Sequence, residues 1–134
     1  MIEEVTDITI DGKHIDQYGH VNYKAAPAIL EEFQDALLFH AGVTFDSIEK
    51  DFGLRSFVKK VEVTWDGELK EGDECWVSTI MELGKTSMKF SQTLKKGGLL
   101  VVSQLMVVVL VDSTGKPTAI PAELRKKLWR EDVT

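Results

Sequence analysis

The sequence contains little of what marks disulfide-stabilised or membrane-spanning proteins. It has a single cysteine, Cys75, in 134 residues, so no disulfide can form within the chain. The residues around Cys75 are typical of a strand, which favours a reduced structural thiol over a nucleophile. The longest apolar run, residues 99–111, includes Ser103 and Gln104 and is shorter than the roughly 20 residues that a membrane-spanning helix needs. We therefore expect no membrane span.

Other signals are missing as well. Residues 1–4 lack the basic and apolar segments of a signal peptide, so a cytoplasmic location is expected. The formal net charge of −6 disfavours binding to nucleic acid or to an anionic membrane. His14 and His40 have no cysteine or carboxylate at the spacing of a metal site, and no metal is predicted.

What the chain does contain is typical of one globular domain. Hydrophobic residues make up 43% of the chain and charged residues 28%. A chain of 134 residues is long enough to bury a core of its own. We therefore expect one domain over residues 1–134.

Residues 23–41 carry apolar side chains at spacings of three and four, which predicts a helix. Asn22 is the expected N-cap and Gly42 the expected stop. Pro27 would interrupt a helix that begins at Asn22. The helix therefore either begins nearer Pro27, where proline is tolerated, or has a distorted entry.

The rest of the chain predicts strands joined by short turns. A second helix is expected over 44–52 and a terminal helix over 122–129, with a hairpin turn at 96–98. This order predicts an α+β fold with one long helix laid on a curled antiparallel sheet. The expected strands are 5–10, 54–65, 75–81, 86–94 and 99–111.

The expected strand 99–111 is apolar on both faces. A strand with one solvated face should alternate between apolar and polar residues, so this one must be covered on both sides. One helix covers only one face of a small sheet. The second cover is expected to be another subunit.

The candidate site is the loop before the long helix, which reads Asp16-Gln17-Tyr18-Gly19-His20-Val21-Asn22. Asp16 is either a turn former or a general base or nucleophile, because an ionised carboxylate can attack a carbonyl or deprotonate water. Free N–H groups at a helix start stabilise the negative charge that develops on an attacked thioester carbonyl. His20 is either structural or catalytic, and Gly19 allows a positive φ or the close approach of a ligand.

This loop, followed by Glu31-Glu32 on the helix, resembles the 4-hydroxybenzoyl-CoA thioesterase family of hotdog proteins. The resemblance extends over nearly the whole chain, including the segments 57–63, 69–73 and 84–87. It implies a single hotdog domain, in which a sheet of five to six strands wraps the helix. It also implies a homodimer joined edge to edge, or a homotetramer, with the site at the dimer seam.

The resemblance also implies residue roles. Asp16 would be the nucleophile or base, and the N–H groups of Asn22 and Tyr23 would polarise the thioester carbonyl. His20 and Asn22 would position the loop or the thioester. The expected substrate-binding residues are Gly19 in the loop and, for the CoA phosphates, Lys59, Lys60 and Lys89. No cofactor is expected beyond CoA as part of the substrate.

Two positions depart from the family pattern. His14 stands where many relatives have an acid, and Ala26 stands where many have a tyrosine. The favoured activity is hydrolysis of an acyl-CoA to free acid and CoA. The alternatives are a non-catalytic acyl-CoA-binding protein and a hydratase or dehydratase that uses Asp16 and His20 for proton transfer.

Overall fold

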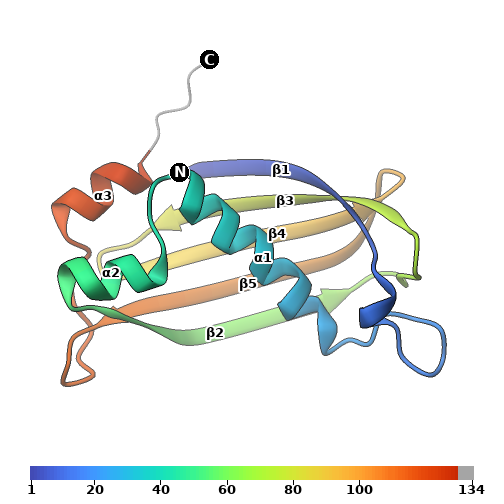
Figure 1. Ribbon diagram of the computed structural model, residues 1–134, viewed down its shortest axis with the longest axis horizontal. Coiled ribbons are helices and arrows are strands. Elements are labelled where there is room, and N and C mark those ends of the chain that lie inside the picture. Colours follow the sequence, from blue (N-terminus) through green and yellow to red (C-terminus); the bar gives the residue numbers. More distant parts are fainter. Residues whose placement is uncertain (130–134) are drawn as a thin grey trace, which may run out of the picture.

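A computed structural model describes residues 1–129 of the chain. One long helix lies across one face of a five-stranded sheet whose strands run in the order β1-β3-β4-β5-β2 (Figure 1). All four strand pairs are antiparallel. The α+β hotdog fold predicted from the sequence is confirmed. Its elements are β1 (Ile2–Thr9), η1 (Gly12–His14), α1 (Ala25–His40), α2 (Phe45–Phe52), β2 (Arg55–Trp65), β3 (Glu74–Leu83), β4 (Ser87–Lys96), β5 (Leu99–Val111) and α3 (Ala122–Leu128).

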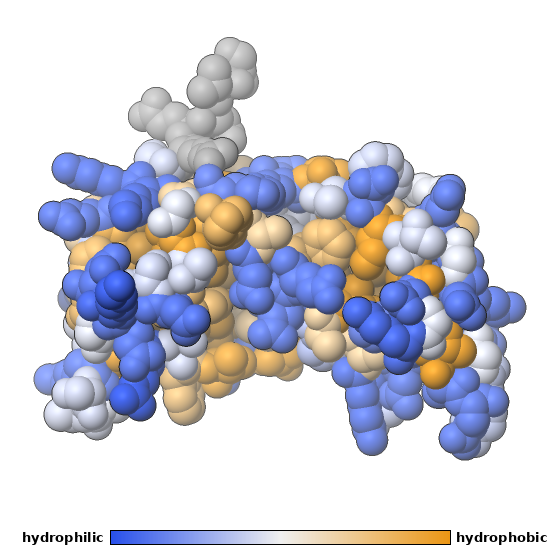
Figure 2. All heavy atoms as spheres, in the orientation of Figure 1, coloured by the Kyte–Doolittle hydropathy of each residue, from blue (hydrophilic) through white to orange (hydrophobic). Residues whose placement is uncertain are grey.

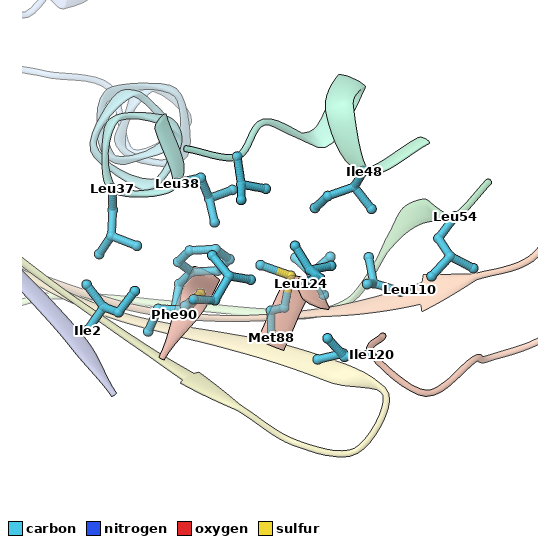
Figure 3. Close-up of a cluster of buried hydrophobic side chains, with 14 residues drawn as sticks. Ile2, Leu37, Leu38, Ile48, Leu54, Met88, Phe90, Leu110, Ile120 and Leu124 are labelled. Carbon is cyan, nitrogen blue, oxygen red and sulfur yellow. The ribbon is translucent and has the colours of Figure 1, made fainter. Parts of the chain in front are cut away.

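The core fills the space between α1 and the inner face of the sheet. Leu37 and Leu38 at the C-terminal end of α1 point toward Phe90 and Met88 of β4, with Ile48 of α2 closing the cluster (Figure 3). A second cluster lies under the N-terminal half of α1 and includes Leu30, Val77 and Leu94. The first cluster anchors the far end of the helix. The second supports the end that carries the candidate site.

The beginning of α1 corrects one prediction. The N-cap is Lys24, without a side-chain cap, and the first helical residue is Ala25, so Asn22 is not the cap. Pro27 is the third residue of the helix, where a backbone N–H has no partner within the helix. Pro27 therefore costs no helical hydrogen bond. Of the two alternatives for Pro27, the structure has the later start.

The other elements lie close to their predicted positions. Thr44 caps α2 through a capping box with Ser47, and Gly53 ends it with φ +68°. The hairpin between β4 and β5 turns at Gly97 and Gly98, which both have positive φ. β1 begins three residues earlier than predicted, at Ile2. Within residues 1–129, no helix is both long and apolar enough to cross a membrane.

The two faces of β5 differ in how they are covered. Val102, Val108 and Leu110 face α1 and are buried. On the opposite face, Leu105 and Val107 are only partly buried. Met106 on the α1 face is also only partly buried and Val109 on the opposite face is buried, so the two faces differ less than predicted, and the second subunit expected over the outer face stays a prediction.

Candidate active site

The loop that joins η1 to α1 is a tight hairpin (Figure 1). Ile15 and Val21 pair as an isolated antiparallel bridge. The N–H of Asp16 donates to the His20 carbonyl at 2.8 Å, and the N–H of Gly19 donates to the Asp16 carbonyl at 3.1 Å. Gly19 has φ +79°, a conformation that favours glycine. These bonds bring Asp16 and His20 to opposite sides of one turn.

The carboxylate of Asp16 has one oxygen engaged in the loop and one without a partner. Oδ1 accepts the N–H of Tyr18 at 2.9 Å and the N–H of His20 at 3.3 Å. Oδ2 has no hydrogen-bond partner among the described residues. Asp16 is thus a turn former, as one interpretation of the sequence had it, and it also keeps an oxygen free for chemistry.

Asn22 organises the turn between the hairpin and α1. Its Oδ1 accepts the N–H of Lys24 at 2.9 Å, and its carbonyl accepts the N–H of Ala25 at 2.8 Å. Its own N–H donates to the His14 carbonyl at the longer distance of 3.4 Å. Among the described residues, the N–H of Tyr23 has no partner. The amides predicted to polarise a carbonyl were those of Asn22 and Tyr23, and of these two only the N–H of Tyr23 is unoccupied.

A neighbouring turn, residues 69–73, fastens this loop to the sheet. The Leu69 carbonyl accepts the N–H of Val21 at 2.8 Å. Asp73 Oδ2 in turn accepts the N–H of Lys70 at 2.8 Å and the Nζ of Lys96 at 3.1 Å. The Lys70 N–H, and after it Lys96, hold the pKa of Asp73 below its ordinary value. Asp73 therefore stabilises the turn on which the loop rests.

Asp16, His20, Asn22 and Tyr23 line one open hollow of about 600 Å³. Its apolar lining includes Val21 of the loop and Trp65 at the end of β2. Reasoning from the sequence did not identify Trp65 or Glu68, which also line the hollow. No local signal marks either residue, because they reach the loop only through the curl of the sheet.

His20 faces Glu68 across the hollow, with 3.6 Å between Nε2 and Oε2. The side chain of His20 is 38% exposed and that of Glu68 is 67% exposed. An exposed pair at this distance contributes little to stability. The hydrogen bond that His20 makes to Oδ1 of Asp16 comes from its backbone N–H, while its imidazole pairs with Glu68. His20 therefore holds Asp16 through its main chain.

The three lysines predicted to meet CoA phosphates lie on strands away from the loop. Lys60 pairs with Glu62 of the same strand at 3.1 Å, and Lys89 of β4 pairs with Glu82 of β3 at 3.6 Å. Lys60 and Lys89 are both opposite Val107 of β5, so they share the outer face of the sheet. Lys59 lies at the register shift in β2. The phosphate-binding role of these lysines stays a prediction.

A second hollow, of about 550 Å³, lies at the other end of α1, against α2. Its rim is acidic, with Glu31, Glu32 and Asp35, and burial raises the pKa of Asp35. Such a rim repels an anionic CoA ester. Within residues 1–129, no three His, Cys, Asp or Glu side chains come together as a metal site. The loop hollow is therefore the better candidate.

A model of the thioesterase-like superfamily matches residues 12–128, which include the loop, α1 and the whole sheet except β1. The chain belongs to the thioesterase-like superfamily. This confirms the resemblance found in the sequence. No curated protein sequence matches the chain.

Several solved structures share the fold at low sequence identity. A 1,4-dihydroxy-2-naphthoyl-CoA thioesterase from Synechocystis has a TM-score of 0.86 at 10% identity, covering 94% of this chain and 95% of that one. A hypothetical protein from Aquifex aeolicus has a TM-score of 0.83 at 20% identity, over 94% and 99%. A hypothetical protein from Staphylococcus aureus, solved in complex with CoA, has a TM-score of 0.82 at 17% identity, over 96% and 84%. These likenesses support the hotdog architecture of this superfamily member.

Proposed function

We propose that this thioesterase-like protein hydrolyses an acyl-CoA to the free acid and CoA at the Asp16 loop. The observation that carries the proposal is that only one of the two carboxylate oxygens of Asp16 is hydrogen-bonded. Two loop amides fix Oδ1 and leave Oδ2 without a partner, and Asp16 lines the same hollow as Tyr23, whose N–H is unoccupied among the described residues. A carboxylate oxygen next to a free amide is what hydrolysis of a thioester needs.

In the proposed reaction, the thioester carbonyl oxygen accepts the N–H of Tyr23. Oδ2 of Asp16 either takes a proton from a water that attacks the carbonyl carbon, or attacks that carbon itself. In the first route the tetrahedral intermediate loses the CoA sulfur, which leaves as the thiol after taking up the proton. In the second, the C–S bond breaks and the CoA thiolate leaves as the acyl-aspartyl anhydride forms; water then hydrolyses the anhydride, regenerates the Asp16 carboxylate and supplies the proton of the thiol. Both routes give one acid and one thiol per water consumed.

The family supports this proposal at the level of the reaction class. Membership of the thioesterase-like superfamily favours thioester hydrolysis, and the related fold from Staphylococcus aureus was solved with CoA bound. The two alternatives, a non-catalytic acyl-CoA-binding protein and a hydratase, would use the same Asp16 loop. A hydratase would need the imidazole of His20 at the substrate, and that ring, paired with Glu68, lines the same hollow, so family membership is what favours hydrolysis. The hydrolase is therefore the better-supported reaction.

The test is Asp16→Asn. Asparagine keeps an oxygen for the N–H groups of Tyr18 and His20, so the loop should fold as before, and only the charge is lost. We expect hydrolysis to fall at least about 100-fold, the lower range for a positioned base. Thiol release from a panel of aliphatic and aromatic acyl-CoA esters measures it, with circular dichroism as the control for folding. Near-full activity in a folded variant would refute the role of Asp16.

We also propose that two copies of the chain pair through the edge strand β2. Phe57, Val58 and Val61 of this strand are 59%, 51% and 43% exposed, and Figure 2 shows apolar side chains along the lower edge, where β2 runs in Figure 1. The opposite edge, β1, carries Glu3 and Asp7, which discourage pairing there. Three exposed apolar residues on β2 against one, Val5, on β1 favour a second copy on the β2 edge.

Sedimentation velocity tests this proposal. Val61→Lys places a charge on the exposed edge and should convert a dimer of the wild-type chain to a monomer. Val5→Lys, on the β1 edge, is the matched control, because Val5 is 58% exposed, and it should leave the association state unchanged. A wild-type chain that sediments as a monomer at all concentrations would exclude pairing through β2.

A further inference from the structure

Two aspartates of the chain are followed directly by glycine, in the pairs Asp11-Gly12 and Asp66-Gly67. In such a pair the main-chain nitrogen of the glycine can attack the carboxyl carbon of the aspartate, because glycine has no Cβ to shield that nitrogen. A five-membered succinimide forms, which later opens to aspartate or isoaspartate. The reaction needs a carboxyl group that is free to turn back on the main chain and a segment that opens easily. The two pairs differ in both respects.

Asp11-Gly12 is held by contacts on both residues. Asp11 is the N-cap of η1, where its Oδ1 accepts the N–H of Lys13 at 3.0 Å and its carbonyl accepts the N–H of His14 at 3.2 Å. The carboxylate of Glu71 packs against Gly12, since a Cβ added to this glycine would lie 2.7 Å from Oε1 of Glu71. Ring closure at Asp11 must first break the bond to its carboxylate.

Asp66-Gly67 lies in a bend just after β2, and both residues are exposed. The N–H of Asp66 donates to the Val101 carbonyl at 2.8 Å, which fixes the N-terminal side of the bend. Beyond that bond, neither the carboxylate of Asp66 nor the N–H of Gly67 has a hydrogen-bond partner among residues 1–129. The carboxyl carbon and the nitrogen that would react are therefore both unrestrained.

The conversion of Asp66 needs no reagent except water. The nitrogen of Gly67 bonds to Cγ of Asp66, and one carboxyl oxygen leaves as water with the acid proton and the amide proton. Water then adds to one of the two ring carbonyls. Opening at Cγ restores aspartate, whereas opening at the main-chain carbonyl leaves the chain connected through the β-carboxyl group. Isoaspartate thus has the mass of aspartate, a main chain longer by one carbon and a free α-carboxylate.

We propose that Asp66 is a site of spontaneous isoaspartate formation and that its conversion disturbs the hollow of the Asp16 loop. Trp65, Gly67 and Glu68, which flank Asp66 in the sequence, all line that hollow. An extra main-chain carbon at residue 66 displaces these lining residues relative to one another. The modification site follows from the bend alone, whereas its effect on hydrolysis rests on the proposed function.

Peptide mapping of the aged protein tests which of the two pairs reacts. The intact protein is incubated at physiological temperature and mildly acidic pH, digested with trypsin and fragmented by a method that distinguishes isoaspartate from aspartate. Peptides 1–13 and 61–70 report on Asp11 and Asp66. We expect at least about 10-fold more isoaspartate at Asp66, a factor that corresponds to about 1.4 kcal/mol, near the lower range for a hydrogen bond to a charged group.

The unfolded chain is the reference for this comparison. In guanidinium chloride neither pair is held, so Asp11 and Asp66 should convert at comparable rates. A difference that persists in the unfolded chain would mean that the sequence, not the bend, sets the rates. That result, or equal conversion of the two pairs in the folded protein, overturns the proposal.

Gly67→Ala should block the reaction without straining the bend. An added Cβ lies at an ordinary 3.6 Å from Cγ1 of Val101, and Gly67 is not among the glycines with positive φ. The methyl group shields the attacking nitrogen, so isoaspartate at Asp66 should fall several-fold while the level at Asp11 stays the same. Undiminished conversion at Asp66 in this variant would contradict attack by the nitrogen of residue 67.

Thiol release from an acyl-CoA ester measures the effect on the hollow. We expect the rate to fall in proportion to the isoaspartate at Asp66, and aged Gly67→Ala protein to keep more of its own initial rate than aged wild-type protein does. A full rate in largely converted protein overturns the effect on the hollow. Fresh protein that hydrolyses no ester contradicts the proposed function alone, because the peptide map still decides whether Asp66 is the modification site.

Discussion

Replacing Gln92 with methionine should destabilise the protein strongly, although the volume and shape of the side chain hardly change. Gln92 is 2% exposed and makes three hydrogen bonds that tie β4 to α1 and to β3. Methionine removes all three. The buried amide of Gln34 and the hydroxyl of Thr79 are then left without their partner, while the Leu30 carbonyl keeps the bond it makes within the helix.

The size of the effect follows from the groups left unpaired. An unpaired buried polar group costs about 1–3 kcal/mol, and the hydroxyl of Thr79 can rotate to another acceptor. We therefore expect Gln92→Met to lower the free energy of unfolding by about 2–4 kcal/mol. That is a large share of the roughly 5–15 kcal/mol of a typical domain. The midpoint of thermal unfolding should fall by about 10 °C.

Urea unfolding followed by circular dichroism measures this, with midpoint and slope fitted for each variant. Gln104→Met is the matched control, because Gln104 is as buried but has no bond to lose, and its stability should stay level or rise by about 1 kcal/mol. The double variant Gln34→Leu with Gln92→Met should recover part of the loss, since both partners are then apolar. Equal losses for Gln92→Met and Gln104→Met would refute the hydrogen-bond argument.

Three further changes test the supports of the site loop. Because the pKa of Asp73 lies below its unfolded value of about 4, its carboxylate stabilises the fold above that pH, and the contribution is lost as pH falls through the folded pKa. Asp73→Asn should therefore lower stability by about 1 kcal/mol or less at pH 7 and flatten the loss of stability between about pH 5 and pH 2 in acid titrations. Gly19→Ala meets no atom within 4 Å but is held at φ +79°, so it should cost about 1–2 kcal/mol in urea unfolding; an unchanged midpoint would show that the loop relaxes. Pro27→Ala should change stability by less than about 1 kcal/mol, and a gain above 2 kcal/mol would mean that Pro27 distorts α1 after all.

The elements could be predicted from the sequence because local patterns determine them. Thr44 and Gly53 delimit α2, and the glycines at 97–98 specify the hairpin, through chemistry that acts within a few residues. The start of α1 could not be predicted in the same way. Asn22 is a good cap type, but its side chain accepts the N–H of Lys24 and its carbonyl the N–H of Ala25, so its acceptors form a turn that ends where α1 begins, two residues before the observed cap.

The site was predictable only in part, for a related reason. The loop is contiguous in sequence, so Asp16, Gly19, His20 and Asn22 could be singled out together. The rest of the hollow is not contiguous with the loop, because Trp65 at the end of β2 and Glu68 in the turn after it lie far along the chain from Asp16, and only the fold brings them to the loop. A buried glutamine in an apolar strand carries no sign, in sequence, of whether it is paired.

The two core glutamines have opposite roles. Both polar atoms of the Gln92 side chain are paired within the chain, and their bonds fix α1 against β3 and β4. Among the described residues, neither polar atom of the Gln104 side chain is paired, so the chain retains an unpaired amide where an apolar side chain would be more stable. Two equally buried glutamines opposite each other on β4 and β5 thus differ in what they contribute, and it is the paired amide of Gln92 that holds α1 on the sheet.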